Sequence, residues 1–434
     1  MTADSHIHKV SLASDLLKLQ RGELSLSSRI DALEARFEAI EPAIQSYLPE
    51  ADRFGRLRRD AHELEARCQN AATLPPLYGA LLGIKDIFHV DGFPTRAGTQ
   101  LPSALFAGAE ADVVTRLKQA GALIVGKTVT TEFAYFEPGP TRNPHNLAHS
   151  PGGSSSGSAA AIAAGLAHVT IGTQTVGSVI RPAAYCGVVG FKPSFARVDT
   201  TGLVDFSPAA DHVGFFSADV ADMLAIAAAV IDDWWPAPNH KPRPVLAAPI
   251  GAYLEQSTAL DAFQAQLDAL EGAGYPIKRI PMFDDIAVID ARHQDLIAAE
   301  LAQQHREWFA QHERLYRPRT AALIRHGKSV APKRLQAVRD HRFELRARIR
   351  RKMDDEEIDL WICPSAPDVA PRGLGATGSP AMNMPWTHAG LPAVSLPAGT
   401  GMWSLPLGLQ LVGRFGEDEA LLAFAKAIGR VFAR

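Results

Sequence analysis

The sequence predicts an α/β protein, a three-layer α/β/α sandwich around a central, mixed and twisted β-sheet. Short apolar segments bounded by glycine, typical of buried strands, alternate at close spacing with segments of helical periodicity. Of the 434 residues, 47% are apolar and 21% are charged, which indicates a well-packed globular protein. We find no linker and no internal repeat, so we expect a single domain over residues 1–434.

The first 70 residues predict a helical lead-in that packs on a larger body. Apolar side chains recur there at helical spacing, at Ile30, Leu33, Phe37 and Ile40. The core is expected in residues 71–230, where buried strands alternate with helices. We expect strands at 79–84, 122–125 and 167–172, and helices at 112–120 and 159–166.

Residues 240–360 are richer in charge and predict a helical variable region, which could form a lid or a cap. Its apolar helical face is made by Leu260, Phe263, Leu267 and Leu270, and a solvated helix follows at 333–353. Residues 361–434 are expected to complete the core, with a strand at 407–413 and a helix at 418–432.

Composition excludes several classes of protein. A formal net charge of -3 leaves no electrostatic footprint for nucleic acid or an anionic membrane. Three widely spaced cysteines (Cys68, Cys186 and Cys363) form no disulfide framework. The polar N-terminus gives no sign of a signal peptide, and no apolar stretch would span a bilayer. We therefore expect a cytoplasmic protein.

Two local motifs are expected to mislead. Residues 121–128 match the phosphate-loop pattern G-x-x-x-x-G-K-[ST], but the interior is an apolar strand preceded by a helix, so we expect a buried strand. Residues 153–157 match the nucleophile elbow G-x-S-x-G, but a loop precedes them in place of the required strand. An esterase that uses Ser155 with Asp368 and His388 is the alternative.

Lys85 ends an apolar run and precedes Asp86, which predicts a lysine at a strand end near the core. Burial disfavours an ammonium group and lowers the pKa of a lysine, and a neutral lysine can act as a base. The alternative is a lysine paired with an acid.

Two glycine-flanked serines supply the hydroxyl groups. Ser154 lies in Pro151-Gly-Gly-Ser-Ser-Ser-Gly-Ser158, a turn that leads into an alanine-rich helix. Ser178 ends Gly172-Thr-Gln-Thr-Val-Gly-Ser178, where consecutive backbone N–H groups could form a nest for an oxyanion. A nucleophilic hydroxyl needs a base within hydrogen-bond reach and such donors. An ordinary glycine-rich loop is the alternative.

With these parts in this order, the chain resembles the amidase signature family, the Ser–Ser–Lys hydrolases, from Pro75 onward. The strongest stretch is 150–194, which includes Tyr185-Cys-Gly-Val-Val-Gly-Phe-Lys-Pro193. Outlying matches are Ala120–Thr128, Glu132–Ala134, Asp211–Gly214, Ala389–Val394 and Gly408–Gly413.

The resemblance implies Ser178 as the nucleophile, Ser154 as the bridging serine after a cis peptide bond, and Lys85 as the base. It implies an oxyanion hole made by the backbone N–H groups of Thr175, Val176, Gly177 and Ser178. Family position and aromatic content suggest an acyl pocket lined by Phe133, Phe136 and Trp386, with ordinary core residues as the alternative.

Three positions depart from the family pattern. Gln174 stands where the family usually has aspartate, Val176 where it usually has glycine, and Arg181 lies one place late. A valine would be strained if its position required a positive φ. These departures concern fine geometry and substrate preference.

The resemblance implies hydrolysis of a linear amide, or of a related carbamate or urea, through an acyl-serine intermediate. The partner is then a small-molecule substrate, with no metal, organic cofactor, nucleic acid or membrane, and a homodimer is compatible with the sequence. His145 and His149 are not expected to bind a metal, because Pro144 and Pro151 break the intervening helix. Alternatives are the glutaminase subunit of a tRNA-dependent amidotransferase, a urethane or ester hydrolase on the same scaffold, and a weakly catalytic binding protein.

Overall fold

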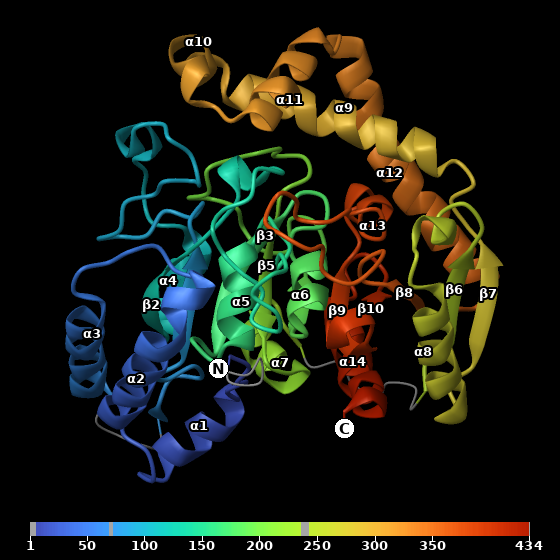
Figure 1. The fold of residues 1–434 in the computed structure, drawn as a ribbon. Helices are drawn as coiled ribbons and strands as arrows, with labels where there is room; N and C mark the ends of the chain where they lie inside the picture. Colours follow the sequence, from blue (N-terminus) through green and yellow to red (C-terminus); the bar gives the residue numbers. More distant parts are fainter. Residues whose placement is uncertain (1–5, 69–72, 236–242, 434) are drawn as a thin grey trace.

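The computed structural model describes residues 6–68, 73–235 and 243–433, and within them ten strands form one mixed sheet (Figure 1). The strand order is β2-β1-β3-β5-β4-β9-β10-β8-β6-β7. The strands are β1 (Leu81–Lys85), β2 (Leu123–Thr128), β3 (Val169–Gln174), β4 (Val189–Lys192), β5 (His212–Ser217), β6 (Leu246–Ile250), β7 (Ile277–Pro281), β8 (Leu360–Pro364), β9 (Ala393–Thr400) and β10 (Pro406–Val412). The predicted α/β class with a mixed sheet is confirmed.

Helices form in every region where the sequence predicts helical periodicity, and also at 180–186, 220–230 and 384–388, where it predicts none. They are α1 (Leu12–Gln20), α2 (Leu26–Ile44), α3 (Arg53–Arg67), α4 (Asp112–Gln119), α5 (Ser156–Ala163), α6 (Ile180–Cys186), α7 (Val220–Val230), α8 (Leu260–Gly272), α9 (Ile286–Gln304), α10 (Arg306–His312), α11 (Pro318–Ser329), α12 (Pro332–Asp355), α13 (Met384–His388) and α14 (Asp418–Phe432). Leu260 differs from the prediction: it begins α8 and its side chain is exposed, whereas the rest of that predicted face is buried. None of the described helices is both long and apolar enough to cross a membrane.

Helices cover both faces of the sheet. Successive side chains of a strand point to opposite faces, so each strand contributes to the packing on both sides. Phe216 of β5 packs with apolar residues of α5 and α6. Its neighbour Phe215 points to the other face and belongs to the large cluster that includes residues of α7 and α14. The sheet is therefore the middle of three layers.

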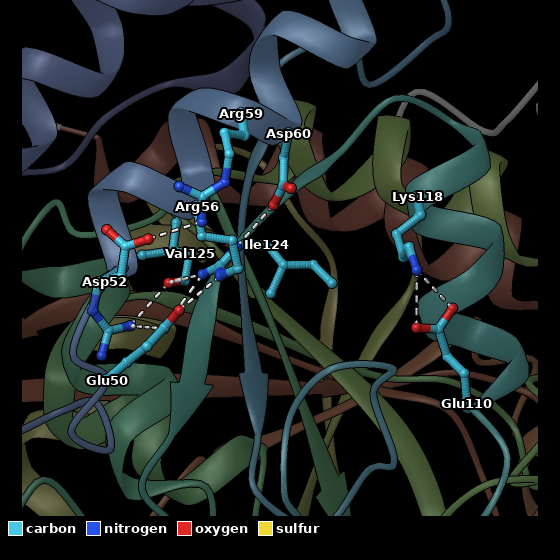
Figure 2. A network of polar contacts seen from close by, with 10 residues as sticks. Glu50, Asp52, Arg56, Arg59, Asp60, Glu110, Lys118, Ile124 and Val125 are labelled. Atoms are coloured by element: carbon cyan, nitrogen blue, oxygen red, sulfur yellow. Dashed lines mark hydrogen bonds and ion pairs between the residues drawn. The ribbon is translucent and has the colours of Figure 1, made fainter.

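The N-terminal helices close the edge of the sheet at β2. An antiparallel bridge joins Tyr47 to Thr128, and the backbone N–H of Leu48 donates to the carbonyl of Lys127 at 2.8 Å. Figure 2 shows Arg56 of α3 reaching the edge strand, where its guanidinium donates to the Ile124 carbonyl at 2.9 Å and the Val125 carbonyl at 3.2 Å. The free carbonyl groups of an edge strand thus receive side-chain donors.

Helices α9, α10 and α11 lie across one end of the central strands (Figure 1). Gly327 permits the close crossing of α11 and α9, since a Cβ atom at this position would lie 1.9 Å from the Ala298 carbonyl oxygen. The backbone N–H of Arg317, just before α11, donates to the buried carboxylate of Glu132 at 3.0 Å. The helical region is therefore fastened to the loop that follows β2.

Candidate active site

Lys85 is fully buried at the end of β1. Its Nζ lies 2.7 Å from Ser154 Oγ and 2.6 Å from Thr173 Oγ1, on the neighbouring strand β3. Burial lowers the pKa of Lys85 well below 10.5, although the carboxyl group of Asp211 opposes this shift. A neutral amine at this position has a lone pair to accept the Ser154 hydroxyl proton and N–H groups to donate to Thr173.

The acid next to Lys85 in the sequence serves a different lysine. The Asp86 carboxylate lies 3.0 Å from the Nζ of Lys127, and both side chains are buried. Among the described residues, Lys85 itself forms no ion pair. The alternative of an acid-paired Lys85 is therefore wrong. Lys127, the lysine of the misleading phosphate-loop motif, instead forms a buried ion pair with Asp86.

The Ser154 segment is fixed from two sides. The Gly153–Ser154 peptide bond is cis, as the resemblance implies. Arg181, one helical turn after Ser178, donates from Nη2 to the Gly153 carbonyl at 2.6 Å and from Nη1 to the Gly378 carbonyl at 2.8 Å. The buried guanidinium therefore ties the segment that contains Ser178 to the peptide bond that precedes Ser154.

Gln174 explains how the chain tolerates the loss of the usual aspartate. Its Oε1 accepts hydrogen bonds from the backbone N–H groups of Val179 at 2.8 Å and Ile180 at 3.0 Å. Its Nε2 donates to Thr387 Oγ1 at 2.8 Å. Because the first N–H groups of a helix lack partners within the helix, the glutamine satisfies the start of α6.

The predicted oxyanion loop has unstrained residues and free donors. Val176 is not among the residues with positive φ, so the valine is compatible with the local backbone. A Cβ atom at Gly177 would lie 2.5 Å from Asn383 Oδ1, so glycine is required there for close approach. Within the described residues, the backbone N–H groups of all four predicted donors, Thr175, Val176, Gly177 and Ser178, donate to no protein acceptor. These four groups are available to a ligand.

Three buried side chains hold this loop, and none of them was assigned a role from the sequence. Asp211 accepts a hydrogen bond from Thr175 Oγ1 at 2.6 Å, and burial raises the pKa of this carboxyl group to about 7. His293 Nε2 lies 3.0 Å from the Thr175 carbonyl oxygen, and Thr387 Oγ1 donates to the Val176 carbonyl at 2.7 Å. Asp211 falls in a stretch that matches the family, but His293 carries no local signal.

The predicted pocket residues differ in exposure. Phe133 is buried in a cluster of rings made by Phe106, His305, Trp308 and Tyr316. Trp386 is fully buried and packs against Tyr253, Phe283 and Trp361. Phe136 is partly exposed, and the guanidinium of Arg181 lies 5.4 Å from its ring centroid. Of the three, Phe136 has accessible surface near the Ser154 segment.

The structure does not assemble the alternative Ser-His-Asp site. Ser155 Oγ donates to the Thr173 carbonyl at 3.3 Å. Both ring nitrogens of His388 lie against other histidines, and the Asp368 carboxylate accepts from Thr258 Oγ1 at 2.8 Å. These contacts argue against a triad of Ser155, His388 and Asp368. No group of three or more His, Cys, Asp or Glu side chains in the described ranges is placed to hold a metal ion.

Comparisons with known proteins agree with this geometry. The family model named Amidase matches residues 30–422. A glutamyl-tRNA(Gln) amidotransferase subunit from Synechococcus sp. (strain WH7803) is 33% identical over 471 residues, covering 94% of this chain and 94% of that protein. The corresponding protein of Roseiflexus sp. (strain RS-1), which has the same name, is 32% identical, covering 98% and 97%.

A solved amidase structure is 27% identical and has a TM-score of 0.89, covering 98% of this chain and 100% of that chain. The matched family model, the full-length relatives and the shared fold together show that this chain belongs to the amidase signature family of enzymes that hydrolyse C–N bonds.

Proposed function

We propose that this protein is an amidase that hydrolyses a linear carboxylic amide, or a related carbamate or urea, through an acyl-serine intermediate on Ser178. The observation that carries the proposal is the buried amine of Lys85, which lies 2.7 Å from Ser154 Oγ. The segment that contains Ser154 is in turn held by Arg181, which lies in the helix that follows Ser178. A general base needs this hydrogen-bond reach and a neutral state.

In the proposed reaction, Ser178 Oγ bonds to the carbonyl carbon while its proton passes to Ser154 and the Ser154 proton passes to Lys85. The free N–H groups of Thr175, Val176, Gly177 and Ser178 stabilise the oxyanion, and one such donor typically contributes about 3–4 kcal/mol. The C–N bond then breaks as the proton returns through Ser154 to the leaving nitrogen. Water attacks the ester by the same proton path and releases the acid.

A second candidate function is that of a glutaminase component within a larger amidotransferase. The curated relatives at 33% and 32% identity are named as an amidotransferase component, and the similarity covers nearly their full length. This favours glutamine as substrate and an association with partner chains. The same Ser178 chemistry would apply, with ammonia passed on to a second reaction.

One experiment separates the two candidates. The purified chain alone is given glutamine, aliphatic amides, benzamide, urea and a carbamate, and released ammonia is measured. Turnover of a simple amide without partners, lost in Ser178→Ala, supports the main proposal. A marked preference for glutamine supports the glutaminase component. If none of these compounds is turned over and no serine-reactive sulfonyl fluoride labels Ser178, the proposed function is wrong.

A further inference from the structure

A single-file chain of three histidines connects the predicted oxyanion loop to the helical region. His293 of α9 lies 3.0 Å from the Thr175 carbonyl oxygen through Nε2, and its Nδ1 lies 3.0 Å from Nδ1 of His388 in α13. His388 Nε2 lies 3.0 Å from Nδ1 of His341 in α12. All three side chains are buried.

The rings are neutral in this arrangement. Burial lowers the pKa of His293 to about 3 and lowers the pKa values of His388 and His341 as well. Nearby guanidinium groups of Arg342 and Arg292 further disfavour a charged His388. Each ring then has one N–H donor and one acceptor nitrogen.

The Thr175 carbonyl fixes the tautomer of every ring in the chain. A carbonyl oxygen only accepts, so His293 must carry its proton on Nε2, which leaves Nδ1 as an acceptor. His388 must then donate from Nδ1 and accept at Nε2, and His341 must donate from Nδ1. Any other neutral assignment would place two protons or two lone pairs face to face at one of these contacts.

A hydrogen bond that fixes a backbone carbonyl also fixes the direction of the N–H group of the next residue. In a trans peptide the C=O group and the following N–H point in opposite directions. The hydrogen bond from His293 to the Thr175 carbonyl therefore turns the Val176 N–H away from α9. Thr387, adjacent to His388, holds the Val176 carbonyl at 2.7 Å and turns the Gly177 N–H in the same way. Both amides are predicted donors of the oxyanion hole.

We propose that His293, His388 and His341 form a positioning relay that holds the Thr175–Val176 peptide plane and thereby aims the Val176 N–H at the oxyanion of the substrate. The proposal rests on the function proposed above for Ser178. It makes the helical region of α9 and α12 part of the catalytic support, since two of the three rings come from those helices.

The first test reads the tautomers in the wild-type protein with ¹⁵N-labelled histidine and long-range ¹H–¹⁵N spectra. The expected result is a protonated Nε2 on His293 and a protonated Nδ1 on His388 and His341, each assigned by loss of its signal in a single variant. A protonated Nδ1 on His293, or a charged ring in the chain at neutral pH, overturns the relay whether or not the enzyme turns over an amide.

The second test compares His293→Leu with His293→Gln, which keeps a side-chain N–H donor for the Thr175 carbonyl. The readouts are amide hydrolysis and the rate at which phenylmethanesulfonyl fluoride labels Ser178. We expect His293→Leu to lower kcat and the labelling rate about 10- to 100-fold with KM within about threefold, and His293→Gln to restore most of the loss.

His168→Leu is the matched control, because His168 is a buried histidine that contacts Asp15 and the Leu81 backbone, away from the loop. Labelling of His293→Leu within twofold of wild type overturns the relay, as does an equal loss in His168→Leu at the same thermal stability. An unlabelled wild-type Ser178 instead contradicts the proposed function, and the tautomers then decide the relay alone.

Discussion

Replacing Lys85 by methionine tests the buried neutral amine through stability as well as activity. In the unfolded chain this lysine has its ordinary pKa of 10.5, whereas burial holds the folded pKa well below it. Between the two values the unfolded state binds one proton more than the folded state. The free energy of unfolding of the wild type therefore rises with pH, by about 1.4 kcal/mol per pH unit from this group.

Lys85→Met removes that slope. Over pH 8 to 10 the wild type should gain roughly 2–3 kcal/mol relative to the variant, measured by urea unfolding at matched m-values. Amide hydrolysis should fall by about 10²–10⁴-fold, the usual contribution of a general base. Lys192→Met is a useful partner variant, because burial lowers the pKa of Lys192 to about 7 and, among the described residues, its amine donates only to backbone carbonyls. It should lose a similar slope and keep the activity.

Parallel stability curves for the wild type and Lys85→Met between pH 8 and 10 would mean that the buried amine is charged in the folded protein. The proposed proton path through Ser154 would then have no base.

Two further predictions concern the nucleophile and the helical region. Ser178→Ala should abolish both turnover and labelling by a sulfonyl fluoride, followed by mass spectrometry. Ser155→Ala should keep both within about threefold and cost about 2 kcal/mol of stability for its two lost hydrogen bonds with the Thr173 backbone. Equal losses of activity in the two variants would count against Ser178. Gly327→Ala should destabilise the protein by about 3 kcal/mol or more in urea unfolding, because the new Cβ would meet the Ala298 carbonyl. The control is Gly272→Ala, where the new Cβ has open space and should stabilise the protein by up to about 1 kcal/mol. A tolerated Gly327→Ala would mean that α9 and α11 can separate at small cost.

The sequence was informative where neighbours along the chain determine the structure. Residues 123–128 form the buried strand that the apolar interior of the 121–128 motif predicts, and Lys85 lies at a strand end because an apolar run stops there. The link from Lys85 to Ser154 came from the family resemblance, since the two residues are 69 positions apart in the sequence.

What could not be predicted depends on contacts between distant segments. His293 and the Thr175 carbonyl are separated by 118 positions, and a histidine in a helix has no pattern that identifies its partner. Aromatic content could not separate pocket from core, because rings such as Trp386 bury equally well in either. The role of Gln174 could likewise not be predicted, because it depends on the folded chain placing the first N–H groups of α6 beside the side-chain amide of Gln174.

The Arg56 contacts with β2 bear on how this protein can assemble with others. An edge strand with unpaired carbonyls recruits strands from other chains, and here guanidinium groups and the segment around Tyr47 occupy that edge. A chain shortened to remove α3 would bare an apolar strand to its neighbours and should aggregate. Any partner of the intact protein must instead meet it through side-chain surfaces or along the far margin at β7, where Lys278, Arg279 and Pro281 discourage strand addition.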